Sequence, residues 1–314
     1  MKKGVKVALI LIGSGLLIGG GVMFAIGIKD HKFIAETREV DLSDKDIKNF
    51  EFDLATSELT FIRTTDSTKK VVFHENEKEY HEDKVVEHTL YVTSKETKKW
   101  YEWMTPDWSK KKVEVYLPAG ELGTLKIKSS TGDIKIPHEF TFESADFDVS
   151  TGDVNYKANT SGDVKISIST GDISISDISA KGIELHHSTG KVNLKNVNVT
   201  ECIVIDGSTG KTKLESTRSA CLNIKSSTGD VSLNDVETTG ELKVHGSTSD
   251  IEFDGIDGNG IDMETSTGDI KGSVKTGKVF KAYSSGRVIV PDDTSGAATF
   301  KAKTSTGDIK ITLK

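Results

Sequence analysis

The sequence predicts an all-β fold, a parallel β-solenoid made of coils of about 19–20 residues. Three observations predict it: a turn word, "STG", recurs at a regular interval; apolar and polar residues alternate on both sides of it; and glycine is frequent while large rings are scarce. The chain has 29 glycines among 314 residues, and only 7% of its residues are aromatic. This composition is typical of a repetitive scaffold with small corners.

The interval between turn words sets the length of one coil. Each word is marked by its glycine, and successive markers are 18 to 21 residues apart. Such a period is too short for paired helices or a propeller blade, so each coil holds two strand segments that pair in parallel with those of the next coil. We expect ten coils stacked in sequence order, and right-handed winding. The predicted turn glycines are Gly132, Gly152, Gly171, Gly190, Gly210, Gly229, Gly268 and Gly307, with Ser249 and Gly286 at the two remaining markers.

Four apolar columns accompany the marker, seven and five residues before it and two and four residues after it. The residues between these columns are mostly Lys, Asp, Glu, Ser or Asn. Alternation with a period of two, enriched in Ile and Val, indicates strands with one buried face. The column two residues after the marker contains Ile134, Val154, Ile173, Val192, Val231, Ile251, Ile270, Val288 and Ile309.

The corner itself has two interpretations. As a turn, its glycine takes a positive φ and its Ser and Thr hydrogen-bond the backbone freed at the bend. A further "TSGD" at Gly162 suggests the same turn at the opposite corner of one coil. As a calcium site, the aspartate after the glycine would converge with its neighbours. That column is interrupted by Lys191, Lys211 and Arg287, so we predict a structural turn and no metal.

The amino terminus predicts a membrane anchor. Residues 1–6, "MKKGVK", form a basic cytoplasmic tail, and residues 7–28 carry no charge over a length sufficient to span a bilayer. We expect an uncleaved transmembrane helix with a single-pass, extracellular C-terminal ectodomain at the cell membrane. A cleaved secretory signal is the alternative, although no good cleavage site precedes "KDHK".

The ectodomain divides into two parts. Residues 29–122 are expected to form degenerate coils and an N-terminal cap, with "LATSELTF" as a worn copy of the repeat and "HENEKEYHEDK" as a charged excursion. Residues 123–314 form the regular solenoid. The sequence ends on "TGDIKITLK", which predicts an open edge at the last coil.

The two cysteines, Cys202 and Cys221, lie 19 residues apart and eight residues before consecutive markers. They therefore occupy one column on adjacent coils, about 4.8 Å apart, which is within disulfide range. We expect a disulfide between them. Two free thiols are the alternative, because side chains in register often lack the torsion that a bond needs.

An aromatic cluster interrupts the N-terminal part. Trp100, Tyr101, Trp103 and Trp108 lie in "KKWYEWMTPDWSKKK". They either cover the open end of the core or form a contact surface for a ligand or the anionic membrane. His74, His81 and His88 recur every seven residues, and we interpret them as solvated rather than as zinc ligands.

Other function classes find little support. The formal charge of −7 argues against a nucleic-acid partner. No nucleophile elbow, paired catalytic carboxylates or phosphate-binding loop is present, so we predict no catalytic residue, no cofactor and no enzyme activity.

The segment "VEVYLPAGELGTLKIKSSTGDIKI", followed by repeated "STGDIxI" coils behind an N-terminal anchor, resembles the LiaG-like "putative adhesin" family of bacteria. The resemblance covers nearly the whole chain. It implies a membrane-anchored β-strand-repeat protein at the cell surface, in some genomes encoded beside envelope-stress signalling systems, with no established catalytic residues. We expect a non-enzymatic scaffold or adhesin-like module that binds an envelope protein or wall polymer. The alternatives are an accessory of envelope-stress sensing that acts through its membrane segment and, more distantly, a wall-polysaccharide enzyme.

Overall fold

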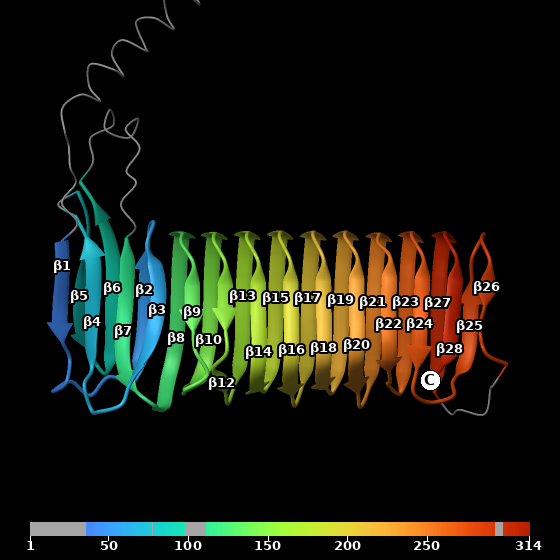
Figure 1. The fold of residues 1–314 in the computed structure, drawn as a ribbon, viewed down its shortest axis with the longest axis horizontal. Coiled ribbons are helices and arrows are strands. Elements are labelled where there is room, and N and C mark those ends of the chain that lie inside the picture. The colour runs from blue at the N-terminus through green and yellow to red at the C-terminus, as the bar shows by residue number, and fades with distance from the viewer. Residues whose placement is uncertain (1–35, 77, 98–110, 293–297) are drawn as a thin grey trace, which may run out of the picture.

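The fold is a rod of stacked β-coils (Figure 1). The computed structural model describes residues 36–76, 78–97, 111–292 and 298–314. These residues contain strands and turns but no helix, and about nine regular turns form a parallel β-solenoid. The predicted fold class is confirmed to that extent. The predicted anchor at residues 7–28 lies outside the described part, within which no helix is long and apolar enough to cross a membrane.

Two sheets run along the whole rod. Sheet I contains, in spatial order, β1 (Glu36–Asp41), β4 (Lys70–Glu75), β7 (Lys112–Pro118), β3 (Glu58–Thr64), β9 (Ile134–Ile136), β11 (Val154–Tyr156), β14 (Ile173–Ala180), β16 (Val192–Val199), β18 (Thr212–Ser219), β20 (Val231–Thr238), β22 (Ile251–Ile256), β24 (Ile270–Val274), β28 (Ile309–Leu313) and β26 (Val288–Ile289).

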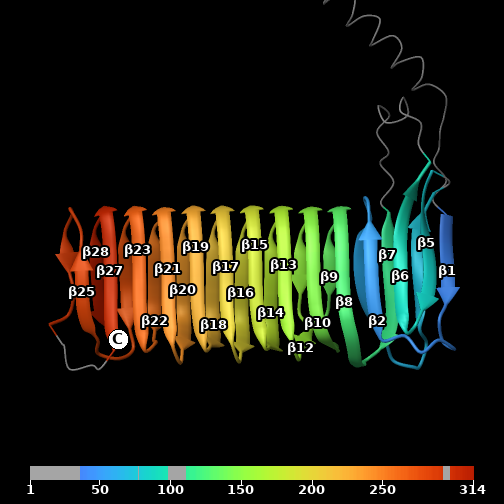
Figure 2. The same ribbon diagram turned by 180° about the vertical axis from the view of Figure 1, so that it is seen from behind.

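Sheet II contains β25 (Val279–Tyr283), β27 (Thr299–Thr306), β23 (Gly260–Thr267), β21 (Glu241–Thr248), β19 (Cys221–Thr228), β17 (Cys202–Thr209), β15 (Gly182–Thr189), β13 (Asp163–Thr170), β10 (Phe140–Thr151), β8 (Gly120–Thr131), β2 (Asn49–Leu54), β6 (Thr89–Glu96) and β5 (Glu79–Val86), with β12 (Asn159–Thr160) beside β10. Figure 2 shows the same stack from behind. A regular coil crosses sheet II, turns at the marker, and returns through sheet I.

The core lies between the two sheets and consists of the predicted apolar columns. Ile173 of β14 pairs with Val192 of β16, and both side chains are fully buried. Equivalent residues thus stack from coil to coil, so one hydrophobic cluster extends along the rod. Burial of these columns is the main stabilising contribution, because no coil can bury its apolar face alone.

The marker corner is a left-handed glycine turn. All eight predicted glycines have a positive φ, between 132° and 147°. Our expectation for the serine and threonine of the corner is confirmed at only some coils, where Gly286 N donates to Ser284 Oγ at 2.9 Å and Ser226 Oγ donates to the carbonyl of Gly229 at 3.1 Å. At most of the predicted glycines the amide is bonded to the neighbouring coil. Gly152 N donates to the carbonyl of Thr170 at 3.0 Å, and Gly171 N donates to that of Thr189 at 3.0 Å. The corners are therefore held by stacking.

The aspartate after the glycine forms a ladder from coil to coil. Asp133 Oδ1 accepts from Asp153 N at 3.0 Å, Asp153 Oδ1 accepts from Asp172 N at 2.8 Å, and Asp172 Oδ1 accepts from Lys191 N at 2.7 Å. The ladder stops there, because a lysine side chain cannot accept the next bond. The recurring carboxylate thus satisfies a backbone amide. Within the described residues, no group of three or more His, Cys, Asp or Glu side chains could hold a metal ion.

A second left-handed column lies six residues after the marker and was not predicted. It comprises Asp177, Asn196, Ser216, Asp235 and Gly255, with φ between 48° and 62°. Here each sheet I strand bends, so that the following residues turn back toward the core. Asp and Asn tolerate this conformation better than most residues with a side chain, serine has no such advantage, and all three lose stability in it.

Replacing Ser216 by glycine should relieve this strain. Ser216 is exposed and has a φ of 48°, so Ser216→Gly should raise the free energy of unfolding by about 1 kcal/mol. Chemical denaturation followed by circular dichroism measures this change. The matched control is Ser232→Gly in the regular part of β20, which should lower stability because glycine loses more backbone entropy on folding. Equal effects of the two substitutions would contradict the explanation.

The opposite corner, which we call the second corner, joins each sheet I strand to the next sheet II strand. Gly162 lies there, between β12 and β13, as predicted from its position in the period. However, Gly162 has no left-handed φ, so the prediction that its "TSGD" repeats the marker turn is wrong. The two words, which contain the same residue types in a different order, therefore form different bends.

At the N-terminal end the coils are not stacked in sequence order. The coil of β2 and β3, which includes "LATSELTF", lies between the coil of β8 and β9 and an outer coil of β6 and β7. Beyond it, β1, β4 and β5 pair in antiparallel fashion and form a cap. The predicted charged excursion "HENEKEYHEDK" is corrected here, because its residues include the strand β5.

The C-terminal end corrects two predictions. The last coil, β27 and β28, does not leave an open edge but lies between the coil of β23 and β24 and the coil of β25 and β26. Phe300 of β27 contacts Phe253 and Phe280 on either side, with ring centroids 5.7 and 5.8 Å apart. Val288, predicted to be in the core, is 40% exposed on the outermost coil. The coil with complete apolar columns takes the inner position because it can bury both of its faces.

Candidate functional site

The second corner carries two shallow polar grooves and, between them, a disulfide. The second corner is formed by Gly162, Lys181, Glu201, Ala220 and Gly240 in successive coils. The regular coils stack most evenly at the marker corner, whereas the lengths of the second-corner turns vary and hollow the surface. This part of the rod therefore differs most from coil to coil, and we describe it as the candidate binding surface.

The groove nearer the C-terminal end of the rod, which we call the distal groove, has a volume of about 480 Å³. Its lining combines apolar surface, to which Gly258, Gly277 and Ala298 contribute, with polar side chains, which include Arg218, Glu237, Thr238, Thr239, Asp257, Asn259, Thr276 and Lys278. The amide of Asn259 donates to the carbonyl of Thr239 at 2.6 Å. The surface thus offers several hydroxyl and amide groups in a fixed arrangement.

The charges of the distal groove are neutralised by one another. Lys278 is 3% exposed and donates to Asp257 Oδ1 at 2.5 Å and to the hydroxyl of Thr276 at 2.6 Å. At the rim, Arg218 and Lys275 both bind Asp235, at 3.0 and 2.6 Å. Hydrogen bonding from Lys275 and Arg218 lowers the pKa of Asp235 to about 2. The carboxylates are therefore engaged as ion-pair partners, which does not suit general acid–base catalysis at neutral pH.

The proximal groove, of about 540 Å³, lies on the same corner nearer the N-terminal end. Glu143, Asp146 and Asp163 alternate there with Lys126, Lys165 and Lys181. Lys165 pairs with Glu184 at 3.3 Å and Lys181 with Glu201 at 3.5 Å. The proximal groove therefore combines two paired lysines and several exposed acidic side chains with small polar residues.

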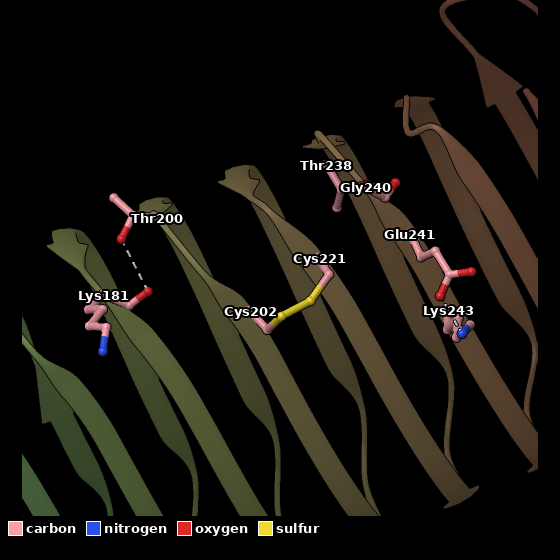
Figure 3. Close-up of a disulfide and its surroundings, with 8 residues drawn as sticks. All are labelled: Lys181, Thr200, Cys202, Cys221, Thr238, Gly240, Glu241 and Lys243. Carbon is pink, nitrogen blue, oxygen red and sulfur yellow. Dashed lines mark hydrogen bonds and ion pairs between the residues drawn. A yellow bond between two sulfur atoms is a disulfide. The ribbon is translucent and has the colours of Figure 1, made fainter.

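Cys202 and Cys221 form a disulfide on the second corner, between the two grooves (Figure 3). They begin β17 and β19, which pair in register, and their Cα atoms are 4.6 Å apart. The two residues are half-buried. The bond fixes adjacent coils to each other where the corner surface is exposed.

Removing this bond should lower stability measurably. The bond closes a loop of 19 residues, so replacing both cysteines by serine should cost about 3 kcal/mol. Thermal unfolding of the double variant and of the unreduced parent gives the difference. Reducing agent should bring the parent close to the variant and leave the variant itself unchanged; a parent insensitive to reduction would contradict this prediction.

The predicted aromatic surface is not placed by the structure. Trp100, Tyr101, Trp103 and Trp108 lie outside the described residues, so the choice between a cap and a contact surface stays a prediction. The eight turn glycines are all at marker corners, where they shape the backbone and line neither of the two grooves. The second corner was missed because its residues share no single motif; only the uneven spacing around Gly162 hinted at it.

His81 corrects the prediction of solvated histidines. It is 4% exposed, its Nδ1 lies 3.0 Å from Glu75 Oε2, and its Nε2 lies 2.9 Å from Ser57 Oγ. A Ser–His–Glu chain has the order of a catalytic triad, but Ser57 is only 2% exposed and the adjacent space holds about 10 Å³. A substrate cannot reach the serine, so the chain acts as a structural link between the cap and the coil of β2 and β3.

This link should make the cap sensitive to acid. Burial lowers the pKa of His81, so the folded protein binds the proton less readily than the unfolded chain, whose histidine titrates near pH 6.5. The stabilising contribution is therefore complete above about pH 6.5 and is lost as the pH falls below it. Once the intrinsic slowing of exchange at lower pH is corrected for, the protection factors of the β5 amides should fall between pH 7 and 5.5. His81→Gln should remove this pH-dependent loss of protection; if the loss persists, another group is responsible.

Comparison with known proteins supplies a family and distant structural neighbours. Residues 47–312 match the family model described as Toastrack DUF4097. No curated protein matches the sequence. A "putative adhesin" of Bacteroides fragilis has a TM-score of 0.42 at 14% identity, over 88% of this chain and 97% of its own. A "putative lipid binding protein" of Parabacteroides distasonis has a TM-score of 0.42 at 17% identity, over 76% of this chain and 93% of its own. A "putative cell adhesion protein" of Clostridium sporogenes has a TM-score of 0.26 at 12% identity, over 89% of this chain and 100% of its own.

Proposed function

Starting from the finding that this chain belongs to the Toastrack DUF4097 family, we propose that it is a non-enzymatic interaction module at the bacterial cell surface. In this proposal it is a LiaG-like member, anchored by residues 7–28 with its N-terminus in the cytoplasm and its rod outside. The rod presents a binding surface to an envelope protein or a wall polymer. Trp100 and its neighbours are proposed to contact the ligand or membrane near the anchor.

The composition of the second corner is the observation that carries this proposal. Its distal groove exposes hydroxyl and amide groups, while the charged side chains there are already paired, as Lys278 is with Asp257. Such a surface can exchange hydrogen bonds with a ligand rich in hydroxyl groups without leaving a buried charge unpaired. A wall glycan has this chemistry. The repeated coil then supplies length and rigidity, and the grooves supply recognition.

Binding to purified wall glycan tests this function. The full-length chain in detergent should bind an immobilised glycan, and Asn259→Ala with Thr239→Ala should weaken binding at least tenfold by removing the donor and its neighbour in the distal groove. The matched control is Asn193→Ala with Ser174→Ala on the flat outer face of sheet I. Equal binding by both variants and the parent would exclude the distal groove. Turnover of the glycan would instead support the enzyme alternative.

A further inference from the structure

The exposed apolar side chains of the rod are confined to its two ends. Among the described residues, five large hydrophobic side chains are clearly exposed: Val86, Tyr283, Val288, Ile289 and Leu313. Val86 ends β5, the outermost strand of sheet II at the N-terminal end. The others belong to the last two coils at the C-terminal end, where Tyr283 of β25 is 62% exposed. Apolar groups on unpaired edge strands are typical of a surface that another strand covers.

The two ends also carry opposite charge. Residues 36–76, 78–97 and 111–118, which form the N-terminal end, contain 16 acidic and eleven basic side chains, a formal charge of −5. Residues 275–292 and 298–314, which form the C-terminal end, contain two acidic and eight basic side chains, a formal charge of +6. Five of these cations are paired with acids of neighbouring coils, for example Lys303 with Glu264. Lys281, Arg287 and Lys310 form no ion pair with any other described residue.

The strand directions at the two ends are compatible. β1 is antiparallel to β4, which is antiparallel to β7, so β1 runs in the same direction as the other strands of sheet I. β26 is the edge of sheet I at the opposite end and also runs in that direction. β1 of a second copy could therefore extend sheet I beyond β26 as one more parallel strand. Glu36 and Glu39 of β1 are exposed, as an acidic partner for Arg287 requires, and Glu39 also binds Lys70 of β4 at 3.0 Å.

We propose that the C-terminal end of the rod, formed by β25, β26 and Lys310, binds the N-terminal end of a second copy of this chain. The contact is head-to-tail and joins an acidic edge to a basic one. A tail-to-tail contact would oppose two basic ends, and a purely anionic polymer would leave the open edge and the apolar side chains uncovered. Because the two contact surfaces differ, each copy can bind one neighbour at either end. This proposal does not depend on the ligand of the second corner.

Site-specific photo-crosslinking of the full-length chain in detergent tests the contact. With p-benzoylphenylalanine at position 283, ultraviolet light at low salt should give dimers and higher multiples, and mass spectrometry should map the crosslink to residues 36–41 or 79–87. The same probe at Val204, on the outer face of sheet II, should give at least tenfold less product. Salt at 0.5 M should reduce the yield severalfold, since it screens exposed charges.

A charge reversal distinguishes the proposed partner from others. Lys281→Glu with Arg287→Glu should abolish crosslinking, and mixing this variant with a tagged chain carrying Glu36→Lys and Glu39→Lys should restore it between the two chains. Crosslinks that join two copies of residues 275–292 would overturn the proposal in favour of a tail-to-tail pair. Capture of added polyphosphate without any crosslink between copies would overturn it in favour of an anionic ligand. Absence of both would overturn it as well.

Discussion

Gly210→Ala should lower the free energy of unfolding by at least about 4 kcal/mol, a large effect for a single methyl group. Gly210 has a φ of 136°, in a region that residues with a side chain rarely adopt. A Cβ there would also collide with the backbone carbonyl of Gly190 in the preceding coil, which cannot move without disturbing its own stack. Backbone strain and lost stacking therefore add. Chemical denaturation of the full-length chain, followed by circular dichroism, measures the change.

Gly120→Ala is the matched control, because a Cβ at Gly120 meets no atom within 4 Å. It should change stability by less than about 0.5 kcal/mol. A similar loss for the two alanine variants would mean that the marker glycine is not required by its conformation. A partial unfolding transition in the Gly210 variant is compatible with the account, since coils contact only their neighbours.

Phe300→Ala should cost about 3–5 kcal/mol and release the C-terminal end of the rod. The ring is fully buried and lies between Phe253 and Phe280, so its removal leaves a cavity between two coils. Hydrogen exchange should rise in β25 and β26, which pair with β27 and β28. Leu313→Ala in the same coil is the control; this side chain is 40% exposed and should matter little. Unchanged exchange in β25 after Phe300→Ala would contradict the inserted position of the last coil.

The regular part of the rod could be predicted because each coil repeats the same local sequence pattern. Ile173 and Val192 occupy the same column, and Gly171 and Gly190 the same corner, so period and alternation suffice to define strands, core and turns. The left-handed column at Asn196 was missed because its members, such as Ser216 and Asp235, are ordinary surface residues in sequence. Only their shared distance from the marker sets them apart.

The ends and the candidate site could not be predicted in the same way. β27 lies inside β25, where Phe300 is buried between Phe253 and Phe280. This is a contact between coils, and no local sequence pattern predicts it. His81 was interpreted as solvated because charged residues surround it in sequence, whereas the fold brings Ser57 and Glu75 to it from other strands. The distal groove likewise combines residues from four successive coils, Arg218 to Lys278, whose types differ at each turn.

In the function proposed here, the repeated marker corner builds the rod and the second corner contacts the ligand. Hydrogen exchange of the full-length chain, with and without bound wall glycan, tests it most directly. Bound glycan should protect residues 218–239 and 257–278, around the distal groove, and should cause no change at the marker corners near Gly190 and Gly210. Protection confined to those marker corners, with the distal groove unchanged, would contradict it.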